Sequence, residues 1–288
     1  MEISAIKDPI FRKAVAAIDM GDIALLQNLL TAYPQLIYKR LDIPEEGYFK
    51  QPYLIWFVAD NPIRNKKLPT NIVAITQLLI ERAKKANFED FQYCIDYTLG
   101  LVSTGSVPRD CGVQIELIDL LIDAGAAPGG GVGALAHGNI DAARHLIERG
   151  GELTLASAVG LDRVDNVHRL LKDATDIDKE VALMMAAFYG KTDMIKLLIQ
   201  DKVNVNAYLT PTSGFHSHAS ALHQAVSSAS VESVRVLVEA GASLEAKDLA
   251  YGGTPLGWAM YMQTEEIDKE KMKKYAKIEE FLHEKMNL

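Results

Sequence analysis

The 288-residue chain has few cysteines, no basic excess and no long apolar run, and each absence excludes a class of protein. Its two cysteines, Cys94 and Cys111, cannot build a disulfide framework and are typical of a reducing compartment. The net charge of -8 opposes a general attraction to nucleic-acid phosphates. The longest uncharged stretch, 203–231, is full of Asn, Ser, Thr and His and is not expected to span a bilayer.

The first residues, 1–12, carry charges throughout and lack the apolar segment of a secretory signal. We therefore expect a cytoplasmic protein with no membrane and no nucleic-acid partner. The remaining composition, 49% hydrophobic and 24% charged, is ordinary for a folded protein and excludes a mainly disordered one. At ~150 residues per domain, the length fits two globular domains or one elongated array.

A pattern recurs along the chain, consisting of an Ala-rich apolar stretch, a small break residue and an apolar helix that often ends in Leu-Leu. The clearest breaks fall at 138, 162, 190, 229 and 263, at intervals of 24, 28, 39 and 34 residues. Between them, apolar residues recur at i, i+3 and i+4, which is one face of a helix. Each repeat is thus predicted to be two antiparallel helices joined by a tight turn, and stacked pairs bury the face that one pair leaves bare.

Several segments carry a family resemblance. Residues 220–225 (SALHQA) and 254–259 (TPLGWA) resemble the start of an ankyrin repeat, whose helix pair begins T-P-L-H-x-A, while 120–126 and 203–207 resemble its close. The match is specific over 129–263. The chain therefore resembles ankyrin repeat proteins of the bacterial type with irregular repeats. This resemblance implies an all-α solenoid of stacked antiparallel helix pairs with few or no strands, and a non-catalytic role in protein binding.

The resemblance also implies one solenoid domain over residues 1–288. We expect an N-terminal cap pair over 8–33, irregular pairs with insertions over 34–128, the clearest repeats over 129–263, and a charged C-terminal capping helix over 264–288.

Details of the repeats follow from their spacing and composition. The short intervals predict compressed helix pairs, the glycines at 129–131 predict a short first helix, and the 39-residue interval predicts a long loop around 206–219. An ion pair at i, i+4 is expected between Glu270 and Lys274. We expect about eight helix pairs, with these residues buried between them: Leu170, Leu197, Leu198, Ala225 and Leu237.

Chemical motifs are few. His216 and His218 would point to one side of an extended segment, as two metal ligands must, and His223 follows closely. A metal- or small-ligand-binding protein, or an enzyme using the His216–His223 segment, is therefore the alternative function. In ankyrin repeats, however, the histidine at the position of His223 bonds backbone in the neighbouring loop. Cys94 is expected in the core. We expect no catalytic residues, no cofactor and no metal.

A partner site is predicted where the family presents side chains to its concave face, namely the two residues before each break and the loop tips. Large apolar side chains at such positions indicate a partner site, or else they pack against neighbouring loops. We expect a monomer that binds an unidentified protein or peptide through the following residues: Phe188, Tyr189, Tyr208, Phe215, His216, Tyr251, Tyr261 and Met262.

Overall fold

The structure, a computed structural model, describes residues 3–42 and 47–287. Every regular element in these residues is a helix and none is a strand, which confirms the predicted all-α class. The predicted domain limits at 1 and 288 lie outside the described residues. The chain divides into two compact units, Met1–Glu152 and Leu153–Leu288, which we call unit 1 and unit 2. The prediction of one continuous solenoid domain stays a prediction.

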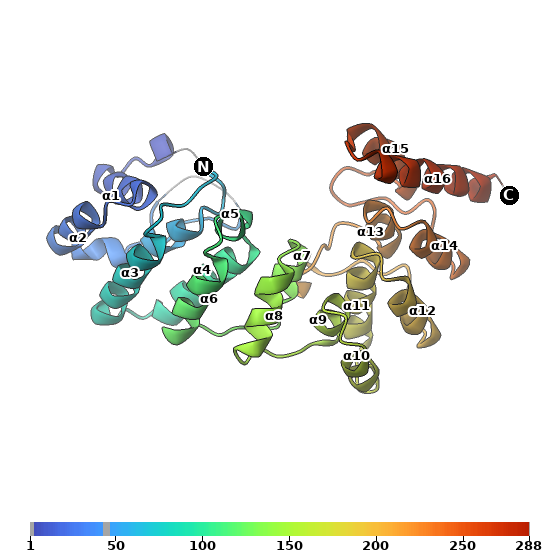
Figure 1. Ribbon diagram of the computed structural model, residues 1–288, viewed down its shortest axis with the longest axis horizontal. Coiled ribbons are helices and arrows are strands. Elements are labelled where there is room, and N and C mark those ends of the chain that lie inside the picture. Colours follow the sequence, from blue (N-terminus) through green and yellow to red (C-terminus); the bar gives the residue numbers. More distant parts are fainter. Residues whose placement is uncertain (1–2, 43–46, 288) are drawn as a thin grey trace. The chain divides into compact units, whose positions relative to one another are not determined.

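The described residues of unit 2, 153–287, form four helix pairs (Figure 1). The first helices of the pairs contact one another in chain order, and the second helices α12, α14 and α16 do the same. The first helices are α9 (Leu155–Gly160), α11 (Asp176–Phe188), α13 (Ala221–Ser227) and α15 (Pro255–Glu265). The second helices are α10 (Val164–Leu171), α12 (Thr192–Gln200), α14 (Val231–Glu239) and α16 (Lys269–Met286), and a 3-10 turn, η4 (Pro211–Ser213), lies in the predicted long loop.

Thr and Ser residues cap the starts of the first helices, and a glycine makes the turn between the two helices of one pair. Each first helix of unit 2 begins after a Thr or Ser, whose side chain can accept a bond from an otherwise unpaired amide. At α11, Thr175 Oγ1 accepts from the amide of Asp178 at 3.2 Å, and Asp178 Oδ2 accepts from the amide of Thr175 at 3.0 Å. Gly190, with φ +63°, makes the turn into α12, and a Cβ there would lie 3.1 Å from Ser230 Cβ.

The described residues of unit 1 also form four pairs, but one of them is altered. Its first elements are α1 (Pro9–Met20), η3 (Leu54–Ala59), α4 (Phe91–Thr104) and α7 (Val132–Ala136), and its second helices are α2 (Ile23–Ala32), α3 (Ile72–Ala86), α6 (Gln114–Asp123) and α8 (Ile140–Glu148). Shorter elements are η1 (Ile3–Ala5), η2 (Pro34–Ile37) and α5 (Ser106–Asp110). The 3-10 helix η3 takes the place of a first α-helix, and all of its residues are buried. The short α7 confirms the prediction from the glycines before it.

The core confirms three of the five predicted leucine and alanine positions. Leu198, Ala225 and Leu237 are fully buried. Leu170 and Leu197 are only half-buried, so their prediction was wrong. Consecutive residues lie about 100° apart around a helix, and the second leucine of each Leu-Leu pair takes the buried position. In α16, Glu270 pairs with Lys273 at 2.7 Å, instead of the expected Lys274.

Candidate functional site

The end of α11 and the long loop that follows α12 bring four of the predicted partner-binding residues together. The ring of Phe188 lies 5.0 Å from that of Tyr189, 5.6 Å from that of Phe215 and 5.0 Å from that of His216. The loop thus folds back over the end of α11. Aromatic pairs at these separations attract one another beyond the area they bury.

Burial differs among these four side chains. Phe215 is 6% exposed, so its ring serves as an anchor for the loop. Phe188, Tyr189 and His216 are half-buried. Burial raises the pKa of Tyr189 to about 12. Of the two alternatives for this part of the site, the contacts of Phe188 and Phe215 favour packing within the fold.

His223 is committed to structure. Its Nδ1 lies 2.7 Å from Ser220 Oγ, and its Nε2 lies 3.0 Å from the carbonyl oxygen of Gly253, to which it donates. This confirms the expected bond to backbone in the neighbouring loop, and both ring nitrogens are occupied. Within residues 3–42 and 47–287, no group of three or more His, Cys, Asp or Glu side chains is placed to hold a metal.

Three other predicted residues line a pocket of about 630 Å³ beside α15. Tyr261 and Met262 come from α15, and Tyr251 comes from the loop before it. Trp258, which sequence reasoning did not select, adds a fourth apolar wall. Tyr251 is 92% exposed and Tyr261 is 64% exposed, so large apolar surfaces lie open to solvent at the mouth of this pocket, which we call the Trp258 pocket.

The carboxylate of Asp248 holds the residues that line the Trp258 pocket in place. Its Oδ1 accepts from the amides of Ala250 and Tyr251 at 2.9 and 2.6 Å, and its Oδ2 accepts from the amide of Gly253 and from Trp258 Nε1 at 2.7 and 3.0 Å. Burial alone would raise the pKa of Asp248, but these hydrogen bonds lower it to about 2. Asp248 therefore fixes both the loop and the indole, and each of its carboxylate oxygens accepts two hydrogen bonds from the protein.

The last predicted residue, Tyr208, joins two loops. Its hydroxyl donates to the carbonyl oxygen of Lys247 at 2.8 Å, next to Asp248. Tyr208 is thus held beside the loop that carries Tyr251, but it does not line the Trp258 pocket.

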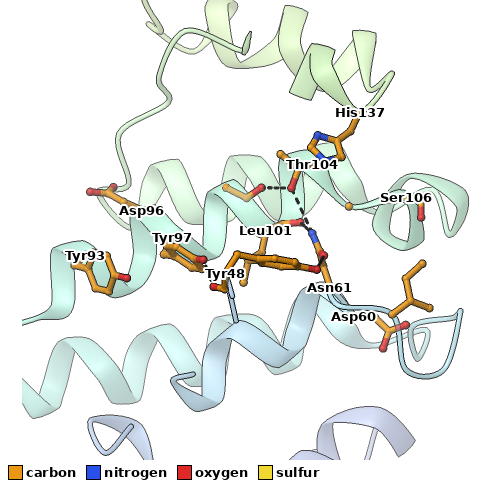
Figure 2. Close-up of a pocket in the computed structure, with 13 residues that line it drawn as sticks. Tyr48, Asp60, Asn61, Tyr93, Asp96, Tyr97, Leu101, Thr104, Ser106 and His137 are labelled. Atoms are coloured by element: carbon orange, nitrogen blue, oxygen red, sulfur yellow. Dashed lines mark hydrogen bonds between the residues drawn. The ribbon is translucent and has the colours of Figure 1, made fainter. Parts of the chain in front are cut away.

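A second pocket, of about 980 Å³, lies along α4 in unit 1 (Figure 2), and sequence reasoning missed it. Tyr93, Tyr97, Gly100 and Thr104 contribute one face of α4 to it, and Tyr48 faces that helix from the loop before η3. We call it the α4 groove. These four positions follow one another at i, i+4, i+7 and i+11, a helical stripe. The stripe is visible in the sequence, but its apolar character by itself indicates only the packed face of a helix.

Hydrogen bonds fix the wall of the α4 groove opposite the helix. Tyr48 Oη donates to Asn61 Oδ1 at 2.9 Å, and Asn61 Nδ2 donates to the carbonyl oxygen of Leu101 at 3.1 Å and to Thr104 Oγ1 at 3.3 Å (Figure 2). The hydroxyl of Tyr97 donates to the carbonyl oxygen of Tyr48. The segments before and after η3 are therefore both tied to α4.

Buried aromatic rings support the tyrosines from behind. The indole of Trp56, in η3, stacks on the ring of Tyr97 with centroids 4.1 Å apart, and its Nε1 donates to the carbonyl oxygen of Cys94 at 3.2 Å. Cys94 is buried, as expected, and burial raises the pKa of its thiol to about 12. A thiol held in this protonated form is a packing group, not a nucleophile.

Comparison with known proteins assigns the family. The family model described as ankyrin repeats (3 copies) matches residues 113–248 and 183–269, which together cover more than half of the chain. The chain belongs to the ankyrin repeat family. Ankyrin repeats are generally protein–protein interaction modules, and the fold is typically non-catalytic.

The crystal structure of the human ASB11 ankyrin repeat domain is similar at 19% identity and a TM-score of 0.33, over 65% of this chain and 88% of that one. A search of curated proteins found no match. No helix in the described part of the chain is long and apolar enough to cross a membrane.

Proposed function

We propose that this protein is a non-catalytic binding module that holds a segment of a partner protein on the concave face formed by the first helices and loops of unit 2. The Trp258 pocket receives an apolar side chain of the partner. Tyr189 and His216 extend the contact surface along the end of α11. Phe188, Phe215 and Tyr208 keep the loops in place beneath it.

The observation that carries the proposal is the exposure of Tyr251 and Tyr261 at the mouth of an apolar pocket. Exposed aromatic side chains offer a large contact area while freezing few rotatable bonds on binding. Asp248, the only carboxylate among the described residues of the lining, already accepts four hydrogen bonds, so it presents no unpaired charge to a ligand. An apolar group is therefore the best match for this pocket.

A selection of peptides displayed on phage, followed by titration of the selected peptides against the full chain, tests the proposal. We expect the peptides to share one apolar anchor residue. Tyr261→Ala should weaken their binding by about tenfold or more, which is the effect of losing a central interface side chain worth about 1.4 kcal/mol. Because Tyr261 is exposed, the Tyr261→Ala variant should keep the melting temperature of the wild-type protein.

Ile177→Ala is the matched control, since Ile177 is 65% exposed but lies in the first turn of α11 and outside the pocket. It should leave peptide binding intact. If Tyr261→Ala leaves binding intact while lowering the melting temperature, Tyr261 is a packing residue and the binding face lies elsewhere.

We further propose a monomeric protein of the cytoplasm. The two cysteines support this location, because both are free thiols.

A further inference from the structure

The length of the α4 groove suits an extended chain. It follows one face of α4 from Tyr93 near the first turn to Thr104 at the last residue of the helix. Thr104 lies 11 positions after Tyr93, and at 1.5 Å per position the two are about 16 Å apart along the helix. An extended peptide rises about 3.3 Å per residue, so roughly five residues span the groove.

Gly100 forms an open floor at the middle of this face. It lies in the interior of α4, where glycine is less favourable than alanine because it loses more conformational freedom on folding. A Cβ built at Gly100 has no neighbour within 4 Å, so close packing within the fold does not require glycine. What the missing side chain provides is access to the helix surface for another chain.

The charged residues that line the groove are acidic. They are Asp60 and Asp96, and among the described residues no Lys or Arg lines it. Asp60 is neutralised inside the fold, because it lies 3.5 Å from Arg64 and accepts from three amides of the following loop. Asp96 accepts from Gln92 Nε2 at 2.9 Å and from the amide of Ala127 at 2.8 Å, and both bonds end on Oδ1. Oδ2 keeps its capacity to accept.

The aromatic rings at the Asp96 end of the groove suit a cation as well. Tyr93 and Tyr97 stand one helical turn apart and on either side of Asp96 in sequence. Tyrosine faces attract ammonium and guanidinium groups. The fold itself uses this attraction nearby, since the guanidinium of Arg40 lies 5.9 Å from the centre of the Tyr93 ring. Arg40 is held by the carbonyl oxygens of Gln51 and Lys50 and does not line the groove.

We propose that the α4 groove binds an extended peptide segment that carries a lysine or arginine. The cationic side chain lies against Asp96 and the rings of Tyr93 and Tyr97, and the peptide main chain crosses the helix at Gly100. This site differs from the Trp258 pocket in its residues, in the unit that holds it and in the chemistry of its ligand. It therefore stands or fails independently of the proposed function.

The probe is the pentapeptide acetyl-Ala-Ala-Arg-Ala-Ala-amide, titrated into the ¹⁵N-labelled full chain and followed by two-dimensional NMR. Its partner probe replaces Arg with citrulline, which has nearly the same shape without the charge. We expect the arginine peptide to shift the amide signals of Asp96, Gly100 and their neighbours in α4. The citrulline peptide should bind about fivefold to tenfold more weakly, as expected for the loss of a charge-assisted contact.

Two variants separate a local contact from general attraction to an acidic protein. Asp96→Asn removes the charge while its amide oxygen can still accept from Ala127, and it should weaken the arginine peptide as much as citrulline does. Asp141→Asn, on the exposed side of α8, removes the same charge outside the groove and should leave binding of the arginine peptide unchanged.

A third variant tests access to the helix surface. Gly100→Leu should fill the groove and abolish the shifts without lowering the melting temperature.

Three results would overturn the proposal. The first is equal binding of the arginine and citrulline peptides. The second is an equal loss of affinity in the two aspartate variants. The third is the absence of any shift in α4 at millimolar arginine peptide.

Discussion

At the scale of single residues, burial decides which leucine of a Leu-Leu pair supports the fold. Leu198 of α12 is fully buried, whereas its neighbour Leu197 is half-buried. We expect Leu198→Ala to lower the free energy of unfolding by about 2–5 kcal/mol, because it loses the transfer free energy of the side chain and leaves a cavity. Urea denaturation followed by circular dichroism measures this change.

Leu197→Ala serves as the comparison on the same helix. Its side chain keeps part of its contact with water in the folded state, so its truncation should cost clearly less than that of Leu198. A cost below about 1 kcal/mol for Leu198→Ala would show that this leucine is not a core residue.

At the scale of elements, the loop before α15 depends on one buried carboxylate. The pKa of Asp248 is lowered from an ordinary value of 3.8 to about 2 in the folded protein. Ionised Asp248 therefore stabilises the fold above about pH 4, and this stabilisation is lost as the pH falls toward 2. The shift corresponds to on the order of 2 kcal/mol at neutral pH.

The pH dependence of unfolding checks this expectation. Asp248→Asn should be less stable than the wild-type protein at pH 6, and the difference in free energy of unfolding should shrink between pH 4 and pH 2. Asp141→Asn, at an exposed carboxylate on α8, should show no such convergence. A difference that stays constant down to pH 2 would mean that Asp248 does not hold the loop through its charge.

At the scale of the whole molecule, repeat proteins gain their stability from contacts between neighbouring repeats. Unit 2 is compact in itself, and its four pairs pack in chain order. We expect the fragment 153–288 to fold alone, with a helical circular dichroism spectrum and a cooperative thermal transition.

A shorter fragment, 190–288, gives the matched comparison. It lacks α11, against which α13 packs, so the apolar side of α13 loses its cover. This fragment should melt at a lower temperature and less cooperatively than 153–288. If 153–288 is unfolded at room temperature, unit 2 is not an independent folding unit.

Much of the local structure could be predicted from the sequence, because the motifs that determine it span only a few consecutive residues. The repeat starts at 220–225 and 254–259 correspond to α13 and α15, and the bond from His223 to the Gly253 carbonyl lies where the family resemblance placed it. The long interval predicted the loop before α13. The 3-10 helix η3 was not predicted, since its fully buried, all-apolar run has no helical or strand period.

The sequence by itself determined the helical class, the breaks between helices and the aromatic positions near them, because apolar period, caps and turn glycines act locally. Tertiary structure alone decided which of those aromatics are covered. The ring of Phe215, in the loop after α12, packs against that of Phe188, while Tyr251 and Tyr261 remain exposed beside a pocket. It also made the α4 groove, through bonds between Tyr48, Asn61 and Thr104. These bonds join residues 13 and 43 positions apart, and their geometry depends on how the intervening elements pack.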